Sequence, residues 1–309
     1  MNGPGAGKDR GGKDRGGKDR GGKEFAAQAL AARLPPLLVA AERVAATVAG
    51  GIHGRRRTGP GETFWQFRRY QAGDPASAID WRQSARATPL FVRETEWAAA
   101  QTVWLWRDGS ASMDWRSHPD LPTKRDRAEL LTLALASLLL RGGERVALLS
   151  GALPPTAGGA ALSRLAEVLA GESTASLPAA ADLPRHAEVV LVSDFLSPLD
   201  EIDAAVRRLA SAGATGHLLQ VLDPAEETLP YAGRIRFAGV EGEGETLVRR
   251  TEDLRDAYAA RLAAHRDGLA AITRAAGWSL TSHRTDTPPQ AALLSLHVRL
   301  AQPRGMGAR

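Results

Sequence analysis

One aspartate and two serines follow the apolar run at residues 102–106 with a spacing that suits a metal ion. They are Asp108, Ser110 and Ser112, in the order Asp-Gly-Ser-Ala-Ser. Carboxylates and hydroxyls are hard oxygen donors, which Mg²⁺ and similar divalent ions prefer, and such an ion leaves a position for a partner's carboxylate. The motif therefore predicts metal-assisted adhesion ahead of catalysis.

A second aspartate, Asp194, lies just beyond the apolar run at residues 189–192. In doubly wound sheets, ligands bind beyond the carboxyl ends of the strands. If the two strands are neighbours, Asp194 completes the shell directly or through water, with Ser193 beside it, and Thr174 in an intervening loop adds a hydroxyl. The alternative is structural, because an aspartate followed by serines also caps backbone N–H groups at a strand-to-helix junction.

Strands and helices alternate from residue 102 onward. Apolar runs predict strands at 103–106, 146–149, 189–192, 217–221 and 278–282. Helical patterns cover 123–141, 160–170, 198–213, 253–276 and 289–300. Thr123 with Asp126 predicts a capping box, and Ser197 followed by Pro198 predicts another helix start. We expect an α/β domain over residues 101–309, with a mainly parallel, doubly wound sheet and helices on both faces.

The residues before this domain divide into three segments. Residues 1–23 contain three copies of Lys-Asp-Arg-Gly-Gly, a glycine-rich charged repeat that cannot bury a core, so we expect a disordered tail. Residues 24–50 repeat alanine and leucine at helical spacing and predict a packing helix, broken at Pro35-Pro36. Residues 51–100 alternate turn signals with short apolar runs and predict a smaller, strand-rich module.

Composition narrows the function classes. The net charge is +5, but residues 1–57 hold twelve Lys and Arg against five Asp and Glu, so the basic excess belongs to the N-terminal part. The chain has no cysteine, which excludes disulfides, thiolate zinc sites and cysteine nucleophiles and fits a reducing, cytoplasmic setting. The longest apolar run, residues 130–140, is shorter than the ~20 residues of a membrane-spanning helix, so we expect no transmembrane segment.

Two resemblances extend this interpretation. Asp108, Ser110 and Ser112, with Asp194 on a later strand, resemble the metal-ion-dependent adhesion site of von Willebrand factor A domains. The residues upstream that carry the second resemblance are Glu62, Phe64, Arg68, Tyr70, Gly73, Asp74, Ile79, Asp80, Trp81, Ser84 and Arg86. In this order they resemble domain-of-unknown-function family number fifty-eight, which is similar to those domains and often encoded beside MoxR-type AAA+ ATPases. Ser77 departs from that family, which commonly has a basic residue there.

The resemblance implies a non-enzymatic, cytoplasmic adaptor that helps a MoxR-type ATPase remodel or mature an unknown client protein, with Mg²⁺ or another divalent cation at the strand ends. A structural reading of the upstream motif also stays open. Gly73-Asp74 would then shape a turn and Asp80 would pair with Arg82. Trp65, Trp81, Trp104 and Trp106 are expected in the core, because large aromatic side chains dominate packing.

Two other functions remain as alternatives. A metal-dependent hydrolase is disfavoured because Ser110 stands where aspartyl-phosphate hydrolases place their second carboxylate, and the histidines lack metal-ligand spacing. Weak nucleic-acid binding could arise from the basic tail and the arginines at residues 55–57. Basic and aromatic residues do not interleave along a strand, so we expect no specific nucleic-acid recognition.

Overall fold

The computed structural model describes residues 16–52, 63–71, 74, 76–86, 89–96, 100–171, 174–240, 242 and 244–301. The expected disordered tail at residues 1–23 lies partly outside this description. Within the described part, helix α1 (Gly16–Ile52) begins eight residues earlier than the helix expected at residue 24.

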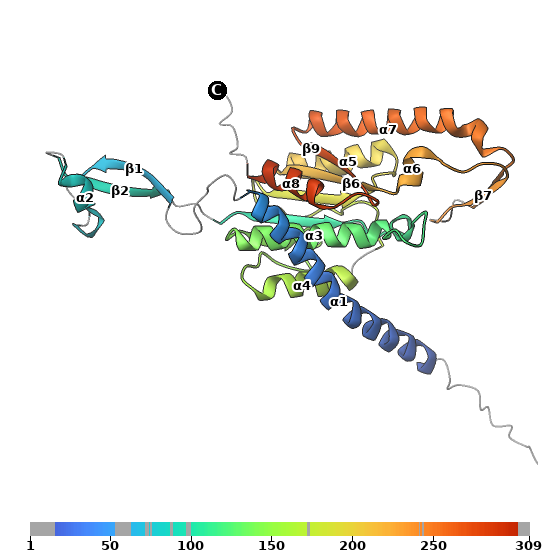
Figure 1. Cartoon of the computed structure of the whole chain (residues 1–309), viewed down its shortest axis with the longest axis horizontal. Helices are drawn as coiled ribbons and strands as arrows, with labels where there is room; N and C mark the ends of the chain where they lie inside the picture. The colour runs from blue at the N-terminus through green and yellow to red at the C-terminus, as the bar shows by residue number, and fades with distance from the viewer. Residues whose placement is uncertain are drawn as a thin grey trace, which may run out of the picture.

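A parallel sheet of five strands forms the centre of the α/β domain (Figure 1). The strand order is β4-β3-β5-β6-β9, and each neighbouring pair is parallel. This confirms the predicted α/β class and the five predicted strands. Their bounds are β3 Thr102–Arg107, β4 Arg145–Leu148, β5 Glu188–Ser193, β6 Thr215–Leu222 and β9 Ser279–Arg284.

Helices cover both faces of the sheet. Alternate residues of β5 point to opposite faces, so Val190 and Val192 belong to the core that includes α1, α3, α4 and α8, whereas Val189 and Leu191 belong to the core that includes α5 and α7. The helices are α3 Lys124–Arg141, α4 Ala160–Gly171, α5 Leu199–Ser211, α7 Arg255–Ala275 and α8 Gln290–Leu300. Among the described residues, no helix combines the length and the apolar character that a membrane span requires.

Helix α1 continues through Pro35 and Pro36, so the predicted break is wrong. A proline inside a helix removes a hydrogen bond and costs about 3 kcal/mol. Here the helix packs along α3 and also contacts α4 and α8 (Figure 1). It buries Ala41, Val44, Ala45 and Val48 in the core beneath the sheet, and this burial offsets the cost of the prolines.

The strand-rich module predicted at residues 51–100 is an antiparallel hairpin. Its strands are β1 (Thr63–Arg69) and β2 (Phe91–Glu96), and the connection between them contains a 3-10 helix (Ala76–Ala78) and the short helix α2 (Trp81–Ser84). Figure 1 shows this module apart from the five-stranded sheet and its helices.

Several local predictions need correction. Pro198, not Ser197, holds the N-cap position of α5, and its side chain makes no capping bond. Short helix α6 (Pro224–Thr228) and the antiparallel pair β7 (Ile235–Ala238) and β8 (Glu245–Val248) were not predicted. A 3-10 turn at Thr251–Leu254 precedes α7, so the regular helix begins two residues later than expected. The predicted Thr123–Asp126 capping box of α3 is confirmed.

Candidate functional site

The predicted polar residues lie at the switch point of the sheet. Strand β3 has β4 on one side and β5 on the other, so the chain leaves β3 in one direction and later returns on the opposite side. Such a reversal opens a crevice at the carboxyl ends of the two strands, where α/β proteins bind ligands. The Asp108 N–H donates to the Val192 carbonyl over 2.8 Å, which joins the two strand ends directly.

Asp108 lies at the centre of the polar cluster at these strand ends and is 1% exposed. Its Oδ1 accepts hydrogen bonds from the Ser110 N–H (2.7 Å) and the Ser110 hydroxyl (2.6 Å), and its Oδ2 accepts one from the Ser193 hydroxyl (2.6 Å). Burial raises the pKa of Asp108, and the hydrogen bonds from Ser110 and Ser193 partly oppose that rise. The carboxylate is therefore desolvated and held by neutral donors.

A chain of side chains connects Asp108 to Asp194. The Ser110 and Ser112 hydroxyl oxygens lie 3.1 Å apart, and the Ser112 hydroxyl donates to Asp194 Oδ2 over 2.8 Å. The other oxygen of Asp194 accepts the Leu196 N–H at 3.1 Å. Four of the five predicted metal-site residues thus form one cluster, which also includes Ser193 through its hydrogen bond to Asp108.

Thr174 is the exception. The N–H of Gly109 donates to the Ala175 carbonyl over 3.1 Å, so the loop that contains Thr174 lies against the Asp-Gly-Ser segment. Thr174 itself is exposed, and in the described structure its hydroxyl makes no hydrogen bond to the cluster. The loop that contains Thr174 therefore lies beside the cluster, but the Thr174 side chain is not part of the cluster.

Lys124 is a member of the cluster that sequence reasoning missed. The Lys124 side chain is 1% exposed, and its ammonium donates to Asp194 Oδ2 over 2.8 Å and also to Glu226 Oε1. Burial lowers the pKa of Lys124, but the attraction of Asp194 and Glu226 outweighs it and the net shift is upward, so the ammonium is charged. The sequence contains one indication that Lys124 has a special role. A lysine at the first position of a helix is unfavourable with respect to the helix dipole, so a nearby negative charge is expected to compensate it.

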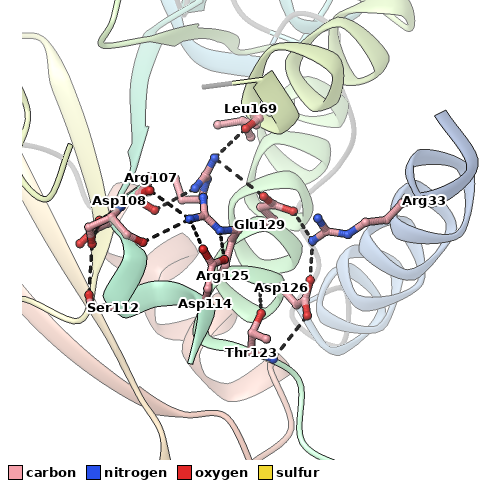
Figure 2. A network of polar contacts seen from close by, with 12 residues as sticks. Arg33, Arg107, Asp108, Ser112, Asp114, Thr123, Arg125, Asp126, Glu129 and Leu169 are labelled. Carbon is pink, nitrogen blue, oxygen red and sulfur yellow. Dashed lines mark hydrogen bonds and ion pairs between the residues drawn. The ribbon is translucent and has the colours of Figure 1, made fainter. Parts of the chain in front are cut away.

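Arginine side chains hold the backbone of the Asp-Gly-Ser loop (Figure 2). Arg107 donates to the Asp108 carbonyl at 2.8 Å and to the Leu169 carbonyl at 2.6 Å. Arg125 donates to the carbonyls of Gly109 and Ser110 at 3.0 and 3.2 Å and forms an ion pair with Asp114. These hydrogen bonds therefore fix the backbone of the loop without any ligand.

The same network continues to α1. Glu129 is buried and accepts a hydrogen bond from Arg33 of α1 at 2.7 Å, and it lies 3.8 Å from Arg107. Arg33 also bonds Asp126, the residue that closes the capping box of α3 (Figure 2). Burial raises the pKa of Glu129, and both arginines oppose that rise. Helix α1 thus contributes a charge to the layer that supports the site.

The family-motif residues lie in the hairpin module and not at the strand-end cluster. Asp74 Oδ2 accepts the Gln71 N–H (2.8 Å), Asp80 Oδ1 accepts the Gln83 N–H (2.9 Å) as the N-cap of α2, and Ser84 Oγ accepts the Phe91 N–H (2.9 Å). Each of these side chains therefore shapes a local turn or cap. The expected pairing of Asp80 with Arg82 is replaced by this capping bond.

The remaining motif residues differ in their contacts and exposure. The Tyr70 hydroxyl donates to the Asp74 carbonyl at 3.1 Å, and Ile79 forms a bridge with Val92. Arg86 is exposed. Glu62 and Gly73 lie outside the described residues, and Phe64 and Arg68 belong to β1 with side chains that are not described.

The tryptophans divide between core and surface. Trp106 is buried and Trp104 is half-buried, as expected. Trp81 is 64% exposed, so its predicted place in the core is wrong. Trp81 is the first residue of the four-residue α2, on the hairpin that Figure 1 shows apart from the five-stranded sheet. The side chain of Trp65 lies outside the described part of β1.

The donor chemistry of the cluster fits a divalent cation. Two carboxylates and the hydroxyls of Ser110 and Ser112 meet at one edge of the sheet, and hard oxygen ligands of this kind suit Mg²⁺. Within the described ranges no group of three or more His, Cys, Asp or Glu side chains could hold a metal ion. A cation here would therefore depend on the serine hydroxyls and on water, as Mg²⁺ commonly does.

The fold and the cluster define a parallel α/β domain with a polar site at its topological switch point. Residues 66–268 match the family described as "Protein of unknown function DUF58", and the chain belongs to this family. The uncharacterized proteins Rv1480 of Mycobacterium tuberculosis and Mb1516 of Mycobacterium bovis are each 31% identical over 282 residues, which cover 83% of this chain and 85% of each relative.

Two solved structures share weaker similarity. The conserved hypothetical protein BatB from Bacteroides thetaiotaomicron aligns with 66% of this chain and 99% of its own, at 15% identity and a TM-score of 0.35. An aerotolerance-related membrane protein from Bacteroides fragilis aligns with 64% of this chain and 98% of its own, at 16% identity and a TM-score of 0.38. Scores this low decide neither fold nor function.

Proposed function

We propose that this protein is a non-enzymatic adaptor that binds a partner through a divalent cation at the strand-end cluster. Asp108, Ser110 and Ser112 would hold the ion, and Asp194 would act directly or through water. The observation that carries this proposal is the convergence of these four side chains at the switch point, through contacts of 2.6–3.1 Å. An acidic side chain of the partner would complete the coordination.

The chemistry of the site suits adhesion. A bound divalent cation supplies positive charge that attracts a carboxylate, and Mg²⁺ retains waters that such a ligand can replace. Arg107 and Arg125 fix the carbonyls of the Asp-Gly-Ser loop, so little ordering is required when a partner docks. Ser110 takes the place of a second carboxylate after β3, which favours binding over phosphoryl transfer.

The proposed partner is a MoxR-type AAA+ ATPase, which the adaptor would connect to a client protein during remodelling or maturation. Support for this assignment comes from membership of the DUF58 family together with its resemblance to von Willebrand A domains. The arrangement of β3, β5 and the polar loops is compatible with that class of domain.

The cation site is tested by calorimetric titration with Mg²⁺ and Mn²⁺. We expect the wild-type protein to bind, and Asp108→Asn to weaken binding by more than about tenfold because it removes the charge with little change of shape. The matched control is Asp80→Asn, since Asp80 is also an aspartate that accepts a backbone N–H but lies in the hairpin module. Equal binding by Asp108→Asn and wild type would contradict the proposal.

The adaptor role needs a separate measurement. Association of the full chain with a purified MoxR-type ATPase should be detectable in Mg²⁺ and should fall in EDTA, and Asp108→Ala should abolish it without unfolding the domain. Unchanged association in EDTA and in Asp108→Ala would mean that the two proteins meet through another surface.

A further inference from the structure

Lys124 lies inside the candidate cation site and already supplies a positive charge there. Its ammonium connects three elements, because it stands at the start of α3 and contacts Asp194 after β5 and Glu226 in α6. The Lys124 side chain is 1% exposed and that of Asp194 is 4% exposed. An ion pair this deeply buried is costly to form and strongly resists the loss of one partner.

One oxygen atom of Asp194 accepts hydrogen bonds both from Lys124 and from a proposed metal ligand. Asp194 Oδ2 accepts the Lys124 ammonium and the Ser112 hydroxyl, each at 2.8 Å. Ser112 is in turn 3.1 Å from the Ser110 hydroxyl, which donates to Asp108. A divalent cation held by these groups would therefore lie close to the ammonium, and two positive charges at short range in a poorly solvated site repel strongly.

Glu226 is a second carboxylate with which the Lys124 ammonium forms an ion pair. Its Oε2 accepts the Asp223 N–H at 2.9 Å within the capping box of α6, so the carboxylate is held in position independently of Lys124. The Tyr258 hydroxyl also donates to the Glu226 carbonyl at 2.6 Å, which ties α6 to α7. The Glu226 side chain is more exposed than that of Asp194, so it lies on the side of the cluster that is nearer to solvent.

We propose that Lys124 is a built-in competitor of the divalent cation, and that a metal ion binds when the ammonium releases Asp194 and keeps Glu226. This inference rests on the proposed cation site and deepens it, because it names the residue that sets how tightly the site holds metal. Without metal, Lys124 compensates the charge of Asp194. With metal, the ion takes over that role.

Two substitutions with opposite expected effects test this competition. Lys124→Met removes the competing charge and keeps a long unbranched side chain, so its affinity for Mg²⁺ should rise by about tenfold or more. Glu226→Gln removes the carboxylate to which the ammonium retreats, so Lys124 should hold Asp194 more firmly and Mg²⁺ affinity should fall. Glu227→Gln is the matched control, because Glu227 is the next residue but pairs with Arg266 and Arg284.

Calorimetry with Mg²⁺ on the full chain gives the affinities, and thermal unfolding with and without Mg²⁺ gives an independent readout. Metal-free Lys124→Met should melt below the wild type because Asp194 loses its counter-ion, and Mg²⁺ should raise its melting temperature more than that of the wild type. Should Lys124→Met fail to fold, Glu226→Gln still decides the question through the direction of its change.

The outcomes separate the inference from the proposed function. Wild-type binding with equal or weaker affinity in Lys124→Met would overturn the competition and leave the cation site intact, and so would an unchanged or higher affinity in Glu226→Gln. Absence of Mg²⁺ binding in the wild type and in every variant would overturn the cation site itself. Tighter binding in Lys124→Met with weaker binding in Glu226→Gln would establish both.

Discussion

The hairpin module and the strand-end cluster use the same residue types for different purposes. In the module, Asp80 accepts the N–H of Gln83, only three residues along the chain. In the cluster, Asp194 is bound by Ser112 and Lys124, which lie 82 and 70 residues away. Local contacts of the first kind shape turns and caps. Buried, long-range contacts of the second kind bring charges together and build a site.

The two regions also differ in how they place aromatic side chains, which leads to the largest expected effect. Trp106 is 6% exposed in the core beside α5 and α7, whereas Trp81 of the module is 64% exposed. We expect Trp106→Ala to lower the free energy of unfolding by about 3–5 kcal/mol and Trp81→Ala to change it by less than about 0.5 kcal/mol. Urea denaturation of both variants measures this, and a similar loss in both would show that the module is part of the same folding unit.

The buried histidine of β9 supplies the second test. Burial, with a contribution from Arg127, lowers the pKa of His283 from 6.5 to about 4. The unfolded chain therefore takes up this proton first as the pH falls, and the native state loses stability between about pH 6.5 and pH 4. Between pH 7 and pH 5 the loss from this residue is about 2 kcal/mol.

His283→Gln should remove that part of the pH dependence. Chemical denaturation at pH 7 and pH 5 should show a smaller decrease in the variant than in the wild type, while His118→Gln, at an exposed histidine, should retain the wild-type decrease. If His283→Gln shows the full wild-type decrease, the histidine is not held neutral by its surroundings.

The smallest expected effect concerns the cap of α2. Asp80→Ala removes the side chain that accepts the Gln83 N–H, and the loss of such a cap costs about 1 kcal/mol. Hydrogen exchange at residues 81–84 should become faster, while exchange in β3 and β5 and the affinity for Mg²⁺ stay unchanged. Faster exchange at the strand ends as well would mean that the module supports the site.

The sequence predicts the α/β domain well because its signals are local. The apolar runs at β3 and β5 and the capping box at Thr123 identify their elements without any knowledge of the fold. The proximity of Asp108 and Asp194 required one further assumption, that β3 and β5 are neighbours, and the strand order confirms it. With that assumption, four of the five candidate ligands are predicted to lie in one cluster, as the structure shows.

The parts that the sequence did not predict depend on packing over long distances. The local sequence predicts that Lys124 is a solvent-exposed residue at the start of a helix. The arrangement of β5 and α6 is what brings Asp194 and Glu226 to its ammonium. The continuity of α1 through Pro35 and Pro36 depends on its packing against α3. Conversely, Trp81 has the composition of a core residue, but its hairpin stands apart from the core.

We propose that the strand-end cluster holds a divalent cation and that the hairpin module does not. The decisive experiment is a crystal structure of the full chain grown with Mn²⁺, with anomalous diffraction measured. We expect an anomalous peak among the oxygens of Asp108, Ser110 and Ser112, with the Lys124 ammonium released from Asp194 and still bound to Glu226. No peak at saturating Mn²⁺, with Lys124 still bound to Asp194, would contradict it.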